Sequence, residues 1–421
     1  MDCRLSRVGG QGVYWHPENL ELSLLAGQLA LKVFARGAFP QQWAGIQVNI
    51  GNAYGDRLGC DRAENLENAI AAYERALQIR NREAFPQDWV LTQNNLGLAY
   101  NNRIRGDRAE NLENAIAAYE LTLQVHTREA FPEHWAKTQH NLASAYRERI
   151  KGEPINNLEQ AISTYQQAAQ IFTRQAFPCK WAENQSNLAD ALMKRASLTQ
   201  NFSDLDSAIA LLQDALEVSV PGSPDFIDSQ YRLGNALSRR YEHGQNSEDL
   251  DQAVRAYKTA LDAISPEHYD RQKIWQALPT TQSILGSRLV REGQWQEGLQ
   301  LLLNSVRQLS TGDDALAHAN ALFQTGRAHE TLSDWENARL YYRDALRLYS
   351  HLKDEPGMAK SRAGLGGVLV SQGYLEKGLS ELTKARESYH QLQQPERAAE
   401  IDRLCQAAQR AQDRQATEVF A

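Results

Sequence analysis

The sequence predicts an all-α protein built as a solenoid of antiparallel helix pairs. Three features recur at one spacing of 46 residues and support this prediction. The tripeptide Ala-Phe-Pro occurs at 38–40, 84–86, 130–132 and 176–178. A tryptophan follows each copy at the same offset, as Trp43, Trp89, Trp135 and Trp181. Asn-Leu-Glu recurs at 65–67, 111–113 and 157–159. Copies in one register indicate that a single supersecondary unit is repeated along the chain.

Residues 1–37 form the first of five expected parts. Residues 1–18 occupy the place of a first helix but carry three glycines between positions 9 and 12. Each glycine costs about 1 kcal/mol in a helix relative to alanine. We therefore expect an irregular N-terminus, followed by a partial-repeat helix near 19–36. The segment is either an unusual cap or the remainder of a longer array.

Residues 38–266 hold five extended repeats of about 46 residues, each with two apolar clusters. In the second repeat the clusters are Leu96, Gly97 and Tyr100, then Ala115, Tyr119 and Thr122. Their spacing places small residues where two helices touch and larger ones beside them. The proline of Ala-Phe-Pro suits the first turn of the following helix, where its missing N–H costs nothing. Each unit is therefore predicted to be one helix pair.

Residues 267–391 hold three shorter repeats of about 40 residues. One position is aromatic in all three, as Trp295, Trp335 and Tyr374. Residues 392–413 read as a charged amphipathic helix that caps the last apolar face of the array. Residues 414–421 are expected to be a disordered tail.

The composition excludes several classes of function. The chain has 421 residues, with 45 Lys and Arg against 52 Asp and Glu, so its net charge is −7. An acidic balance argues against a nucleic-acid surface. The most apolar stretch, residues 20–39, is interrupted by charged residues and does not predict a membrane span. The four cysteines are Cys3, Cys60, Cys179 and Cys405. Because they are isolated, we expect neither a disulfide framework nor a zinc site, and we predict a cytoplasmic protein.

No motif indicates catalysis, so we expect no enzyme, no metal and no cofactor. The glycine cluster at 364–367 lies in a helical pattern and lacks the flanking strand and Lys-Ser/Thr of a phosphate-binding loop. His126, His134 and His140 fall in one repeat, but their spacings of 8 and 6 residues do not place them on one helical face. His329 stands where other repeats carry tyrosine and is expected to be packed.

The order of Leu-Gly, Tyr, then Ala, Tyr and Ala in each unit resembles the tetratricopeptide repeat (TPR), whose standard unit has about 34 residues. The longer unit with its Asn-Asn-Leu-Gly core is similar to repeats of the kinesin-light-chain type. The Ala-Phe-Pro-x-x-Trp and Gly-Asp-Arg-Ala-Glu-Asn-Leu-Glu signatures resemble arrays in bacterial proteins with a C-terminal caspase-like peptidase (CHAT) domain. The resemblance covers about residues 19–391. It implies a right-handed α-solenoid, the TPR superhelix, whose concave groove is lined by the first helix of each pair.

The resemblance also indicates which positions of the first helices face the groove, and many of these hold asparagine. An asparagine side chain both donates and accepts hydrogen bonds, so a row of them can bind the N–H and C=O groups of an extended peptide. The candidate groove residues are Asn52, Asn94, Asn95, Asn101, Asn102, Lys137, His140, Asn141, Arg147, Asn187, Tyr231 and Asn235.

Some of these asparagines have a second explanation. Asn49, Asn95, Asn141 and Asn187 recur one period apart. A hydrogen bond between repeats would produce the same regularity, so structural and ligand-binding roles are weighted equally for these four. Asn52, Asn94, Asn101 and Asn102 break the period. Repeat stacking explains them less well.

The leading hypothesis is a non-enzymatic interaction scaffold that binds a peptide or extended protein segment in its groove, in bacterial signalling or defence. Two alternatives stay open: self-assembly into a homo-oligomer through the N-terminal end, or a regulatory subunit of a caspase-like peptidase. The clamp of TPR co-chaperones for chaperone tails is disfavoured, because Val48 and Asn141 stand where that clamp needs Lys and Arg. Neither a nucleic-acid nor a membrane partner is expected.

Overall fold

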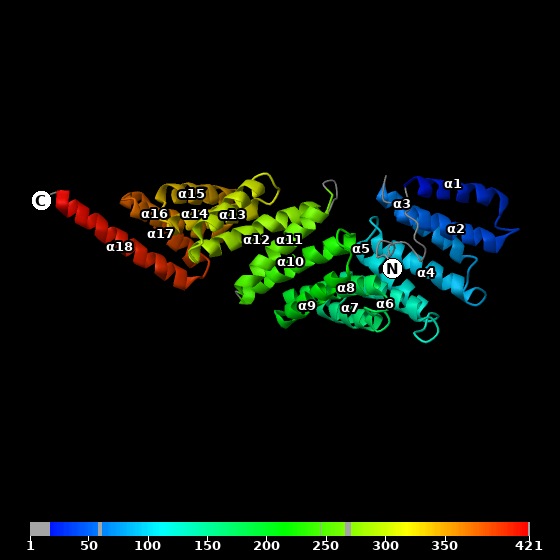
Figure 1. Ribbon diagram of the computed structural model, residues 1–421. Coiled ribbons are helices and arrows are strands. Elements are labelled where there is room, and N and C mark those ends of the chain that lie inside the picture. The colour runs from blue at the N-terminus through cyan, green and yellow to red at the C-terminus, as the bar shows by residue number, and fades with distance from the viewer. Residues whose placement is uncertain (1–16, 58–60, 245, 266–270, 420–421) are drawn as a thin grey trace. The chain divides into compact units, whose positions relative to one another are not determined.

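The computed structural model describes residues 17–57, 61–244, 246–265 and 271–419, and every secondary-structure element in these ranges is a helix. The chain divides into two compact units, Met1–Ala236 and Leu237–Ala421. In each unit successive helices pack against each other in pairs (Figure 1). The predicted all-α class of stacked helix pairs is confirmed. The irregular segment predicted for 1–18 lies almost wholly outside the described residues.

The first unit begins with a single helix, α1 (Pro17–Val33), which takes the place of the expected partial repeat. Four helix pairs and the start of α10 follow it. The pairs are α2 (Pro40–Asp56) with α3 (Arg62–Leu77), α4 (Pro86–Asn102) with α5 (Arg108–Leu123), α6 (Pro132–Glu148) with α7 (Pro154–Ala169), and α8 (Pro178–Thr199) with α9 (Ser203–Val218).

The boundary between the units lies within α10, which belongs to the fifth predicted repeat. The helices from here to the C-terminus are α10 (Pro224–Gly244), α11 (Ser247–Ala263), α12 (Arg271–Arg291), α13 (Trp295–Leu309), α14 (Ala315–Thr331), α15 (Trp335–Leu352), α16 (Glu355–Ser371), α17 (Leu375–Gln391) and α18 (Pro395–Val419).

The repeated tripeptide acts as a helix start. In α2, α4, α6 and α8 the phenylalanine is the N-cap residue, with backbone angles near φ −136° to −140°, and the proline occupies the first helical turn. Proline fits there because the first turn has no N–H partner to lose. The second helices use a different cap: the carboxylates of Asp61 and Asp107 accept a hydrogen bond from the backbone N–H three residues on.

Close approach within a pair depends on a small residue. In α4, a Cβ on Gly97 would lie 2.8 Å from the Tyr119 ring, nearer than such atoms pack. Tyr119 is fully buried. Glycine therefore lets the ring of one helix pack directly on the backbone of the other, as the spacing of the apolar clusters predicts.

The core is a series of small clusters between neighbouring helices. One cluster joins α2, α3 and α4 through Val48, Tyr73 and Leu96. Another joins the last three helices through Ala359, Leu382 and Ile401. Each helix pair therefore depends on its neighbours for burial, which is the physical basis of a repeat array.

Two details differ from the sequence analysis. Helix α18 continues to Val419, where a disordered tail was expected from residue 414. No glycine or proline follows Pro395 to end that helix. Cys179 is disulfide-bonded, whereas Cys405 is a buried free thiol. No disulfide was expected from the spacing of the cysteines, so Cys179 differs from that expectation; its partner lies outside the described residues.

Candidate functional site

The first helices of successive pairs in the first unit contact each other, α2 with α4, α4 with α6, and α6 with α8. Their side chains therefore form one continuous surface. We call it the inner face: the surface of α2, α4, α6, α8 and α10 up to Ala236 that carries the predicted groove residues. Polar groups dominate this surface, and most of them come from the asparagine positions.

Asparagines connect the first three helices of the inner face. Asn95 of α4 donates a hydrogen bond of 3.0 Å to the side-chain oxygen of Asn52 in α2. The same oxygen accepts a bond of 2.8 Å from the Tyr73 hydroxyl. Asn141 of α6 donates to the side-chain oxygen of Asn94 in α4, at 3.4 Å. The periodic Asn95 and Asn141 thus bridge repeats, and each uses an asparagine outside the period as its acceptor.

A charged cluster lies between α6 and α8. The Arg147 guanidinium donates to the side-chain oxygen of Asn187 at 2.9 Å and lies 3.4 Å from the Asp190 carboxylate. Lys194 donates to Glu148 at 2.7 Å. Burial raises the pKa of Asp190, but the nearby cations, Arg147 foremost, outweigh burial and hold that pKa below its ordinary value. The cluster pairs its own charges, so it stiffens the surface.

His140 extends this network across α8. Its Nδ1 lies 3.0 Å from the side-chain oxygen of Asn184, and its Nε2 lies 3.4 Å from the Asn187 amide nitrogen. A neutral ring with the proton on Nδ1 satisfies both contacts, since it donates to one and accepts from the other. Arg232 of α10 also donates to Asn187, at 3.1 Å. Asn187 is therefore a junction of three helices.

The inner face near α4 and α6 is open by comparison. The Asn102 and Lys137 side chains are exposed, and within the described residues neither has a hydrogen-bond or ion-pair partner. The side-chain oxygen of Asn101 is buried without a hydrogen-bond partner. Tyr231 and Asn235 are half-buried on α10 and make further contacts. The structure thus divides the predicted residues into an internally bonded set and a small set with free polar groups.

Sequence reasoning missed a second set of contacts, on the loops. Arg103 and Arg149 each bind the glutamate of the preceding Asn-Leu-Glu through two hydrogen bonds of 2.7 to 2.8 Å, to Glu67 and Glu113. Arg57 forms an ion pair of 2.5 Å with Glu21, which holds the equivalent position one period earlier. The signal was present, since an arginine recurs at each of these positions one period apart.

The histidine spacing argument was incomplete. His126 lies after the end of α5, and its ring is 4.9 Å from the ring of His134 in α6, so the two do meet. His126 is buried, and its Nε2 lies 3.2 Å from the Gln87 side-chain oxygen. Across the described ranges, no three His, Cys, Asp or Glu side chains gather as a metal site would require. In those same ranges no helix is long and apolar enough to cross a membrane.

Comparison with known proteins agrees with this architecture. Tetratricopeptide-repeat family models match residues 89–134 and residues 278–351, one segment in each unit. The chain therefore carries tetratricopeptide repeats at these two segments, and the helix pairs of both units have the architecture of such repeats. Arrays of this class build extended surfaces for protein interaction. No curated protein matches the chain.

A comparison with solved structures matches, among others, three proteins. The apo quorum sensor NprR from B. thuringiensis has 16% identity and a TM-score of 0.42, over 80% of this chain and 89% of that one. Repeats of a putative kinesin light chain from Podospora anserina have 19% identity and a TM-score of 0.34, over 53% and 98%. A Rap protein in complex with competence and sporulation factor has 12% identity and a TM-score of 0.35, over 89% and 99%. Identities this low say nothing about what the present chain binds.

Proposed function

We propose that this chain is a non-enzymatic scaffold whose inner face binds an extended segment of a partner protein or peptide. One observation supports this most directly. Asn101, Asn102 and Lys137 leave polar groups free beside a network in which Asn52, Asn94, Asn95, Asn141, Arg147 and Asn187 are hydrogen-bonded. An unpartnered buried oxygen such as that of Asn101 is unfavourable unless something donates to it.

The free groups define the chemistry of the segment. The two carboxamides bind main-chain N–H and C=O groups, which requires no particular side chain. The Lys137 ammonium selects an acidic side chain or a terminal carboxylate nearby. The bonded residues around Arg147 and Asn187 hold α6 and α8 in place. The surface is therefore arranged before the partner arrives, and less ordering entropy is lost on binding.

The wider setting follows from the sequence signatures alone. A regulatory role in bacterial signalling or defence, with a caspase-like peptidase as the partner to be regulated, stays a prediction from the resemblance. Location in the cytoplasm is a prediction from the scattered cysteines.

The test is peptide selection followed by measured affinities. Peptides selected from a random display library on the purified full chain would be titrated against wild type and against Asn101→Ala/Asn102→Ala/Lys137→Ala. We expect at least a tenfold loss of affinity in this inner-face variant, because two carboxamides and one charge are removed. A matched variant, Asn114→Ala/Lys258→Ala, removes exposed groups from second helices α5 and α11 and should bind as wild type does. Equal affinities for both variants would reject the inner face as the site.

A second candidate function is self-assembly through α1. Leu22, Leu25, Leu29 and Val33 lie on one side of this helix, and each is more than half exposed. Exposed apolar rows of this kind mark association surfaces. Light scattering across a concentration series would show a mass that rises towards a dimer, and Leu25→Gln/Leu29→Gln would abolish the rise. A constant monomer mass would reject this candidate.

A further inference from the structure

An arginine links each of the first three repeats to the one before it, and this link changes at the fourth. The partner in each case is a glutamate one repeat earlier: Glu21 for Arg57, Glu67 for Arg103 and Glu113 for Arg149. Arg195 is the next arginine in this register, and its counterpart one repeat earlier is Glu159. Arg195 instead binds Asp204 of its own repeat, through hydrogen bonds of 2.7 and 2.8 Å.

The change has a local cause. In the earlier repeats the position of Asp204 holds asparagine, as at Asn111, whose side chain donates to the carbonyl of Arg105. An aspartate cannot donate, and this one is buried, with 7% of its side chain exposed. A buried carboxylate needs a cation. Helix α8 also has 22 residues where α6 has 17, so Arg195 lies inside the helix rather than at its end.

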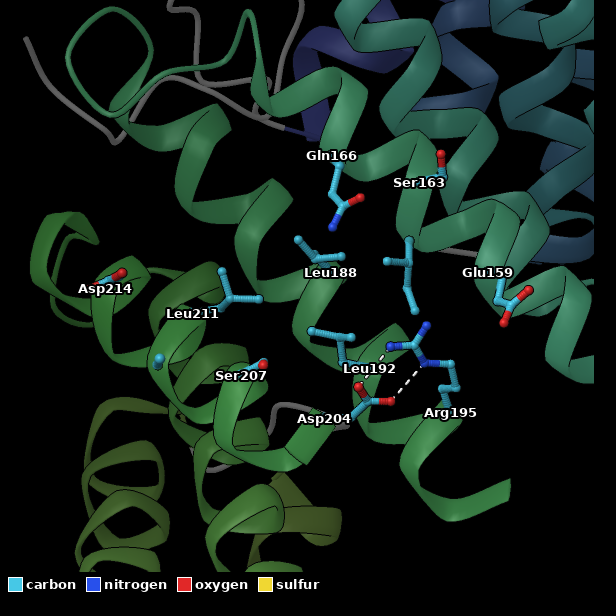
Figure 2. Close-up of a pocket in the computed structure, with 12 residues that line it drawn as sticks. Glu159, Ser163, Gln166, Leu188, Leu192, Arg195, Asp204, Ser207, Leu211 and Asp214 are labelled. Carbon is cyan, nitrogen blue, oxygen red and sulfur yellow. Dashed lines mark hydrogen bonds and ion pairs between the residues drawn. The ribbon is translucent and has the colours of Figure 1, made fainter. Parts of the chain in front are cut away.

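The consequence is a crevice at the repeat position that a paired link occupies in the earlier repeats. Glu159 is exposed, and within the described part of the chain it has no hydrogen-bond or ion-pair partner. A pocket of about 600 Å³ lies here between α7, α8 and α9 (Figure 2). We call it the outer pocket. Leu188 and Leu192 of α8 form its floor, and Leu211 of α9 lines one wall.

The rim of the outer pocket is acidic. Glu159 stands on one side and Asp214 on the other, and both carboxylates are exposed (Figure 2). Asp214 likewise has no ion-pair partner among the described residues. Arg195 is the one basic lining residue, and Asp204 already neutralises it. Two exposed carboxylates without an ion-pair partner therefore flank an apolar floor, and Arg195, which attracts Glu159 at longer range, is bound to Asp204.

We propose that the outer pocket binds a protein segment that presents an aliphatic side chain next to basic side chains. The aliphatic side chain packs against Leu188 and Leu192 on the floor. The basic side chains on either side of it form ion pairs with Glu159 and Asp214. A protein segment fits better than a small molecule, because the rim residues Ser163 and Ser207 are exposed and the pocket does not enclose its contents. This surface is separate from the inner face, so one scaffold would hold two partners or two parts of one.

Three pools of fluorescent octapeptides test the proposal, each with leucine fixed at the centre and arginine, serine or glutamate on both sides. Anisotropy titrations with the full chain at about 0.15 M salt should rank the arginine pool at least tenfold above the glutamate pool. Glu159→Gln/Asp214→Asn should weaken the arginine pool about three- to tenfold, since exposed ion pairs are modest. Asp262→Asn/Glu297→Gln removes two exposed carboxylates elsewhere and should change nothing.

A blocking variant keeps the test independent of charge. Ala210→Trp places a large ring at the exposed edge of the pocket and should abolish binding of all pools. The inner-face variant should bind the arginine pool as wild type does, which separates this proposal from the previous one. Equal binding of the arginine and glutamate pools, no binding of any pool, or binding that survives Ala210→Trp would each overturn it.

Discussion

Two adjacent glycines in α16 give a sharp test of how the helix pairs pack. A Cβ added to Gly366 would lie 3.0 Å from the backbone oxygen of Gly378 in α17 and 2.8 Å from the Leu382 side chain. A Cβ on Gly367 would meet only a side-chain oxygen of Glu330, at 3.9 Å, which is ordinary contact. Gly366→Ala should therefore force α16 and α17 apart, whereas Gly367→Ala should not.

The magnitude follows from two opposing effects. Replacing glycine by alanine inside a helix stabilises it by about 0.5 to 1 kcal/mol, and both variants gain this. Overpacking in a filled core destabilises by about 1 to 3 kcal/mol, and only Gly366→Ala incurs it. The difference between the two variants isolates the packing effect, because the helix-propensity gain cancels. For a unit of this size, that difference corresponds to about 6 °C in melting temperature.

The assay compares thermal melts by circular dichroism with hydrogen exchange of the α16 and α17 amides. Gly367→Ala should melt slightly above wild type, and Gly366→Ala should melt lowest and exchange fastest in these two helices. Equal melting temperatures for the two variants would refute the claim that backbone approach requires Gly366. It would also remove the structural explanation for the glycine cluster at 364–367.

Two further predictions concern ionisable groups. Burial, and then His134, lower the pKa of His126 from 6.5 to about 4, so the unfolded chain binds this proton more readily than the folded one. The free energy of unfolding should thus fall by up to about 3 kcal/mol as the pH drops from 6.5 to 4. In thermal melts across that pH range, His126→Gln should remove this part of the dependence of stability on pH. An unchanged dependence in the variant would contradict the prediction. Hydrogen bonding to Arg149 lowers the pKa of Glu113, so that pair stabilises above the ordinary glutamate pKa of 4.5 and is lost as the pH falls through the lowered value. Glu113→Gln should lower the free energy of unfolding by about 1 kcal/mol at pH 7, measured by urea unfolding. Glu159→Gln changes the same repeat position where no arginine forms an ion pair with it, and should change stability little. Equal effects of the two variants would reject the pairing.

The helix pairs could be predicted because their signals are local. A proline at a helix start, a small residue at a contact and a fixed period each act within a few neighbouring residues. The end of α18 was misjudged for a related reason. Composition suggested a tail, but nothing after Pro395 terminates the helix.

The inner face was less predictable, because facing a groove and being free to bind are different properties. Repeat position indicated that Asn95 and Asn141 face inwards. It could not show that Asn52 and Asn94 accept their hydrogen bonds, since those partners lie 43 and 47 residues away. Whether an inward amide is free depends on the side chain one repeat away. The free groups at Asn102 and Lys137 could therefore be found only by following every hydrogen bond in space.

The outer pocket shows the same limit most clearly. Arg149 and Arg195 stand one period apart, and nothing in the arginines themselves distinguishes them. Their partners differ because the residue that caps the loop is Asn157 in one repeat and Asp204 in the next. An amide that donates leaves its arginine to bridge repeats, whereas a buried carboxylate takes the arginine for itself. In a repeat array, a substitution that departs from the repeat consensus at one position therefore changes the interactions of neighbouring residues that still match the consensus. A distinct binding surface is to be sought where such a departure leaves a charged group without its usual partner.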